Sequence, residues 1–145
     1  MAPVNSDIAV VGHLSIDTLV LPSRTAPFVI LGGAAAYTSL AAKLLDSKAA
    51  VISKVGGNFP EAYLWWLGQE GIDLSGVKKL ADEPTTCFEL SYSKDLSERT
   101  LRLKSKGPTL IDTAVSMARR LRARGRPFRS TKLRERPWTR PSARA

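Results

Sequence analysis

Short apolar runs closed by glycine or proline dominate the first half of the chain. Such runs predict buried strands of an α/β domain, and they occupy residues 7–12, 15–21, 27–31 and 49–55. Two stretches with a helical pattern lie among them, at 34–46 and 60–70. Because the first helix stands between strand-forming segments, we expect a right-handed parallel crossover around it.

The second helical stretch carries two adjacent tryptophans. Gly71 is a natural stop for this helix. Since neighbouring residues of a helix point in different directions, Trp65 and Trp66 cannot share one face. We expect one of them in the core and the other against a neighbouring element or at an interface.

The pattern changes from Val77 onward to alternating apolar and polar positions. Three segments show it, at 77–80, 85–92 and 99–103, with turn-forming residues between them. Alternation of this period is typical of antiparallel strands that are open to water on one face. The sequence therefore predicts an α/β unit with a parallel sheet, followed by an antiparallel segment.

Positive charge is concentrated at the end of the chain. The net charge is +9, and residues 108–145 hold eleven Lys/Arg against only Asp112 and Glu135, so residues 1–107 are neutral. The final segment is rich in Arg, Pro and Ser and has few large apolar residues, so it cannot bury enough surface to offset chain entropy. We expect a domain over 1–107 and a basic tail over 108–145, with a short helix at 111–124 and disorder after it.

Several functional classes are excluded by composition. The single cysteine, Cys87, cannot form an internal disulfide, and with the single His13 it cannot make a four-ligand zinc site. No apolar run approaches the ~20 residues of a membrane span. The N-terminus lacks the basic start of a targeting peptide, so we expect a cytoplasmic protein without a membrane partner.

Two glycine-containing segments are candidates for a binding site. Asp17 follows the strand-ending Gly12 by five residues, and a carboxylate there can accept hydrogen bonds from sugar hydroxyls. Gly32 and Gly33 stand between a strand and a helix, where the backbone can approach a ligand closely. On spacing alone a plain turn is the simpler explanation of either segment, and a binding role is the alternative.

Taken together, these features resemble the N-terminal portion of the PfkB, or ribokinase-like, carbohydrate kinase family over residues 7–107. The resemblance rests on the order and spacing of Val10-Val11-Gly12 with Asp17, Gly32-Gly33-Ala34-Ala35-Ala36-Tyr37, Val55-Gly56, Gly71-Ile72-Asp73-Leu74-Ser75-Gly76-Val77 and Thr85-Thr86. It implies an incomplete ribokinase-like parallel sheet with covering helices, and an antiparallel lid over 77–103. It also implies that Asp17, Gly32 and Gly33 bind the substrate.

The resemblance further implies ATP-dependent phosphoryl transfer, with Mg²⁺, to a hydroxyl of a sugar, polyol or nucleoside. The chain departs from the family pattern at 34–37, where many sugar-specific members have Asn, and at Asn58, where Asp is common. With these departures ribose in particular is not supported, and a nucleoside, inositol or another polyol is equally open. Some members of the family pair through their lid strands, so a homodimer through 85–103 is also implied.

The family motif Gly-Ala-Gly-Asp, which carries the catalytic base, has no counterpart in residues 108–145. A general base alone contributes ~10²–10⁴-fold to the rate, and ATP positioning contributes more. We therefore assign no catalytic, cofactor-binding or metal-binding residue in this chain. We expect a truncated kinase that does not turn over by itself, which leaves open whether the chain is an enzyme.

Two other functions are compatible with the sequence. The substrate and lid segments are also suited to a non-catalytic ligand-binding protein. Clustered arginines at 119–144, with Phe128 and Trp138, would suit polyanion binding through counterion release and base stacking. A solvated tail without a nucleic-acid partner is the simpler interpretation of that segment.

Overall fold

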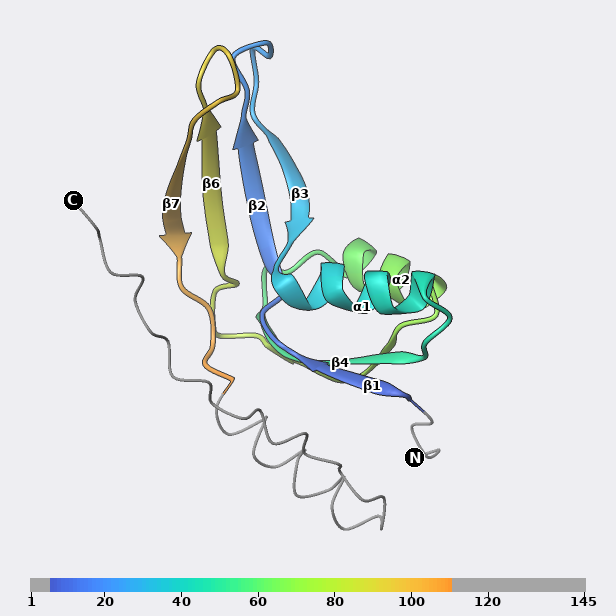
Figure 1. The fold of residues 1–145 in the computed structure, drawn as a ribbon. Coiled ribbons are helices and arrows are strands. Elements are labelled where there is room, and N and C mark those ends of the chain that lie inside the picture. The colour runs from blue at the N-terminus through green and yellow to red at the C-terminus, as the bar shows by residue number, and fades with distance from the viewer. Residues whose placement is uncertain (1–5, 111–145) are drawn as a thin grey trace, which may run out of the picture.

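The computed structural model describes residues 6–110 (Figure 1). It contains seven strands and two helices within this range. Their order is β1 (Ile8–Val11), β2 (Ser15–Val20), β3 (Phe28–Gly32), α1 (Ala34–Leu44), β4 (Ala49–Gly56), α2 (Glu61–Gln69), β5 (Asp73–Leu80), β6 (Cys87–Tyr92) and β7 (Arg99–Ser105). The predicted helix at 111–124 and the predicted disorder of the tail lie outside the described residues.

A parallel sheet of three strands forms the base of the molecule. Its order is β1-β4-β5, and β4 is parallel to both neighbours. Both helices lie on the same face of this sheet (Figure 1). Strand β4 is almost wholly buried because it is the central strand, which explains its continuous apolar sequence.

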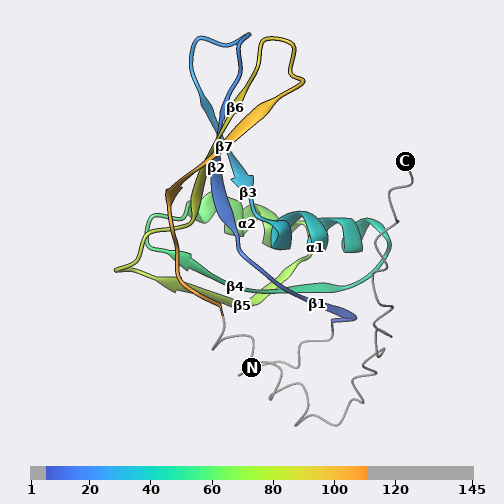
Figure 2. The same ribbon diagram turned by 60° about the vertical axis from the view of Figure 1, so that its left-hand side comes forward.

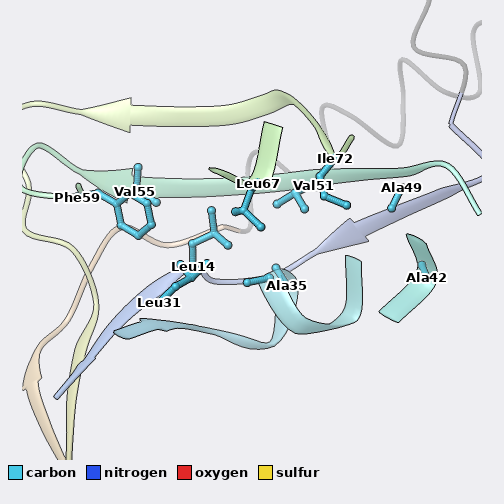
Figure 3. Packing of buried hydrophobic residues seen from close by; sticks show 11 residues of the cluster. Leu14, Leu31, Ala35, Ala42, Ala49, Val51, Val55, Phe59, Leu67 and Ile72 are labelled. Carbon is cyan, nitrogen blue, oxygen red and sulfur yellow. The ribbon is translucent and has the colours of Figure 1, made fainter. Parts of the chain in front are cut away.

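The core lies between this sheet and the two helices (Figure 3). Small residues of α1, Ala35 and Ala36, are buried and allow the helix to approach the sheet closely. The larger apolar side chains that fill the remaining space are Leu14, Val51, Val55, Phe59, Leu67 and Ile72. The base is therefore a layered α/β unit, as the sequence predicts.

A second sheet of four strands stands away from the base (Figures 1 and 2). Its order is β3-β2-β6-β7, and we call it the lid sheet. Strands β2 and β3 are antiparallel, as are β6 and β7, but β2 and β6 are parallel. The chain enters this sheet twice, from β1 into β2 and from β5 into β6, and it returns to the parallel sheet once, from β3 through α1 to β4.

Two expectations about these elements are wrong, and a third is incomplete. Residues 77–80 are the end of β5 in the parallel sheet, because an edge strand with one wet face also alternates. The antiparallel pair of lid strands is confirmed as β6 and β7, but the lid sheet also contains β2 and β3, and β2 is parallel to β6. The strand directly before α1 is β3, which belongs to the lid sheet, and the parallel partner of β4 is β1. The parallel crossover through α1 therefore does not join β3 to β4.

Neither tryptophan of α2 is in the core. Trp65 is 68% exposed and Trp66 is 40% exposed, and Leu67 is the fully buried side chain of this helix. The core-facing side of α2 consists of Leu67, with Tyr63 and Leu64 partly buried beside it. Gly71, with φ of 81°, follows the helix as predicted. None of the helices described over residues 6–110 is long and apolar enough to cross a membrane.

Candidate functional site

Asp17 lies on β2, at the end of the lid sheet nearest the base. Its Oδ1 atom accepts a hydrogen bond of 2.8 Å from the hydroxyl of Ser15, which is itself 1% exposed. The Asp17 side chain is only partly buried. The buried Ser15 hydroxyl thus orients one carboxylate oxygen of Asp17. The carboxylate can still accept further hydrogen bonds from a ligand.

Gly32 supplies the space that the Asp17 carboxylate occupies. The residue ends β3 directly opposite Ser15, which is two residues before Asp17 on β2 and therefore on the same face of the lid sheet. A Cβ atom at position 32 would overlap the carboxylate group of Asp17. A glycine is therefore required at position 32 by the Asp17 carboxylate, and not only by a turn.

Gly33 directly precedes helix α1 and has a backbone conformation that favours glycine. Its φ is 96°, and a Cβ atom there would overlap the carbonyl oxygen of His13. The chain passing from β3 into α1 therefore lies directly against the chain passing from β1 into β2. The structure brings all three predicted residues to this one crossing.

Sequence reasoning missed the neighbours of Asp17 on the lid sheet. Asp17 is in register with Ile30 on β3 and with Phe88 on β6. Phe88 is in turn in register with Leu103 on β7. Residues in register across a sheet share one face. The carboxylate thus has an apolar side chain on each side. Only the register reveals this row, because its members are far apart in the sequence, between Asp17 and Leu103.

A second set of hydrogen bonds joins the lid to the base at Thr85, which is fully buried. Its hydroxyl accepts the backbone N–H of Gly56 at 3.0 Å, and its own N–H donates to Oδ1 of Asn58 at 2.8 Å. Its carbonyl accepts a hydrogen bond from the hydroxyl of Ser105 on the lid side. The Asn58 side chain is thus bound to Thr85, and helix α2 has no side-chain cap.

Two tyrosines attach the free edge of β3 to the helices. The hydroxyl of Tyr37 on α1 donates to the carbonyl of Leu31 at 2.7 Å. The hydroxyl of Tyr63 on α2 donates to the carbonyl of Val29 at 3.4 Å. These bonds occupy edge carbonyls that would otherwise be available to another strand.

The candidate site does not contain the elements of a metal centre. Over residues 6–110 no group of three His, Cys, Asp or Glu side chains is arranged to hold a metal ion. The strongest electrostatic perturbation described lies elsewhere, in the β6–β7 turn. There, hydrogen bonds from Ser93 and Ser97 lower the pKa of Asp95 to about 2.

Comparison with known proteins relates this chain to a group of kinases. No family model matches the sequence. The cytidine kinase of Thermococcus kodakarensis is 36% identical over 89 residues, which are 61% of this chain and 31% of that protein. The chain thus spans about a third of the length of this curated relative.

Solved structures give the same relationship. A nucleoside kinase of the ribokinase family from Methanocaldococcus jannaschii matches with a TM-score of 0.59 and 24% identity, covering 66% of this chain and 35% of its own. An uncharacterized sugar kinase from Pyrococcus horikoshii matches with a TM-score of 0.59 and 26% identity, covering 72% and 38%. That protein has also been solved in complex with ATP.

A nucleoside kinase from Burkholderia thailandensis, solved in complex with inosine, also matches. Its TM-score is 0.61 at 17% identity, covering 74% of this chain and 38% of its own. These findings confirm the resemblance to part of the PfkB, or ribokinase-like, kinases. They also confirm the mixed α/β fold with a parallel sheet and a lid sheet.

Proposed function

We propose that residues 1–107 form the substrate-binding and lid part of a PfkB-type kinase, with Asp17, Gly32 and Gly33 as substrate-binding residues. The observation that carries this proposal is the placement of the Asp17 carboxylate over Gly32, where the lid meets the base. A carboxylate held by Ser15 and open on its other side can accept hydrogen bonds from the hydroxyls of a sugar, polyol or nucleoside. The identity to a cytidine kinase supports the same function.

Phosphoryl transfer requires ATP, its metal ion and a base, as well as a bound acceptor. Residues 6–110 do not fit a Mg²⁺ site of clustered carboxylates, and the sequence has no Gly-Ala-Gly-Asp motif. We therefore assign to this chain acceptor binding and, through the lid, exclusion of water from the acceptor. We expect the 145-residue chain alone to bind the acceptor without phosphorylating it. Two expectations stay predictions: that the protein is cytoplasmic, and that the basic tail has no nucleic-acid partner.

The experiment is calorimetric titration of the full chain with cytidine, inosine, ribose and myo-inositol, for wild type and Asp17→Asn. Binding of at least one compound that weakens about tenfold or more in the variant supports the proposal. A flat titration for every compound contradicts it. A parallel assay with ATP and Mg²⁺ tests turnover, and phosphorylation by this chain would contradict the expected inactivity.

A homodimer through the lid is supported by one specific observation. The lid face that carries Asp17 also carries Leu101 and Leu103, which are 57% and 51% exposed. The edges are less suited to pairing, because β7 bears charged residues and tyrosine hydroxyls occupy β3. We propose that a second copy covers the outer part of this face. Sedimentation of Leu101→Glu against wild type tests it, and an unchanged monomer or dimer would contradict it.

A further inference from the structure

The carboxylate of Asp17 lies in an apolar row of the lid sheet. Ile30, Asp17 and Phe88 are in register on β3, β2 and β6, so their side chains project from the same face at neighbouring positions roughly 5 Å apart. Phe88 is partly buried, as is Asp17, and both retain accessible surface. An acceptor for hydroxyls thus stands beside an aromatic ring.

The side chains in register with Asp17 across the lid sheet offer no second polar group to a ligand. Ser15 is buried and already donates to the carboxylate. The start of α1, which follows Gly33, presents Ala34 with no hydrogen-bonding side chain. Hydroxyls of a simple sugar or polyol that face Ile30 and Phe88 would find no hydrogen-bonding partner on these side chains, whereas an apolar group there would be removed from water.

A ligand that combines hydroxyls with a flat apolar group matches this arrangement. Base–aromatic stacking is independent of base identity, because every base has a π-face. We propose that Phe88 is a specificity-determining residue, which stacks on the base of a nucleoside while Asp17 binds the ribose hydroxyls. This inference rests on the proposed function, since it requires a substrate at Asp17.

The consequence is a preference for nucleosides over base-free ribosides. Stacking of one base on an aromatic side chain corresponds to about 5- to 100-fold in affinity. The preference belongs to the ring of Phe88, whereas affinity for the ribose part belongs to Asp17. The two contributions are therefore separable by substitution.

The test is titration of the full chain with cytidine and with methyl β-D-ribofuranoside, which replaces the base by a methyl group. Wild type should bind cytidine about 5- to 100-fold more tightly. Phe88→Leu should reduce this ratio to near one while leaving riboside affinity unchanged, and Phe88→Tyr should keep it. Asp17→Asn should weaken both ligands equally.

Glu89→Gln is the matched control, because Glu89 is next along β6 on the opposite face and pairs with Lys104 at 3.4 Å. It should leave both affinities unchanged. Equal wild-type affinities, or an undiminished ratio in a folded Phe88→Leu protein, overturn the inference while Asp17-dependent binding still supports the proposed function. Absence of Asp17-dependent binding for both ligands overturns both. If Phe88→Leu fails to fold, transfer of saturation from the Phe88 ring to the base protons of cytidine decides, and no transfer overturns the inference.

Discussion

Asn58 holds Thr85 through its side-chain oxygen, which accepts the Thr85 backbone N–H at 2.8 Å. The bond joins the loop after β4 to the segment that enters β6, so it spans the junction between base and lid. The backbone N–H of Gly56 returns a bond to the Thr85 hydroxyl. A Cβ atom at Gly56 would overlap the backbone of Pro84, which shows how closely the two segments pack. The position of the lid therefore depends on side chains of the base.

Replacing Asn58 by Ala removes the acceptor and leaves a part-buried N–H without its partner. We expect a loss of about 1–3 kcal/mol in the free energy of unfolding. Asn58→Asp retains an acceptor oxygen and should lose less. Urea denaturation of the two variants, with hydrogen exchange at the Thr85 amide, provides the measurement. Equal stability of Asn58→Ala and wild type would contradict this role.

Gly32→Ala places a methyl group where the Asp17 carboxylate lies. Because the neighbouring chain at Gly33 and His13 is packed too closely to yield, we expect a loss of about 1–3 kcal/mol in stability and loss of Asp17-dependent binding. Thermal unfolding and ligand titration measure the two effects.

The matched control is Gly68→Ala. A Cβ atom at Gly68 would meet nothing within 4 Å, and the residue is inside α2. We expect this variant to gain about 0.5–1 kcal/mol, because alanine is the better helix former. A similar loss of stability in both variants would show that glycine-to-alanine changes are harmful for a reason other than overlap with Asp17.

The two tyrosine bonds to β3 differ in length, and their removal should differ in effect. Tyr37→Phe breaks a bond of 2.7 Å and should cost about 0.5–1.5 kcal/mol. Tyr63→Phe breaks a bond of 3.4 Å to an exposed site and should cost less. Chemical denaturation of both variants checks the order, which a larger effect of Tyr63→Phe would reverse.

The turn between β6 and β7 should respond to acid. The pKa of Asp95 is lowered from 3.8 to about 2 by hydrogen bonds from Ser93 and Ser97. A lowered folded-state pKa stabilises the turn above pH 3.8, and this contribution is lost as the pH falls through about 2. Carbon-13 NMR of the Asp95 carboxyl follows the titration. Ser93→Ala should raise this pKa toward 3.8, and an unchanged midpoint would contradict the assignment.

The sequence determined the local elements of this protein. Apolar runs marked the strands β1 and β4, but only the central strand β4 is buried, as is typical of a strand with neighbours on both sides in a parallel sheet. The expectation that residues 7–12 form a buried strand is wrong, because β1 is an edge strand whose Ile8 and Val11 are exposed. Glycine marked the end of α2 and the start of α1, since only glycine adopts positive φ without strain. The order of the motifs also indicated the kinase family and the three candidate residues. These residues lie close together because the chain segments that carry them pass directly against each other.

Tertiary structure alone decided which strands pair and which side chains share a face. Residues 77–80 alternate like a lid strand but end β5, because exposure on one face produces the same pattern in either sheet. Phe88 comes beside Asp17 only through the parallel pairing of β2 with β6. Register is a long-range property, and a shift of one residue would turn Phe88 to the opposite face. For that reason the spacing along the chain identified Asp17, and the fold supplied its neighbour.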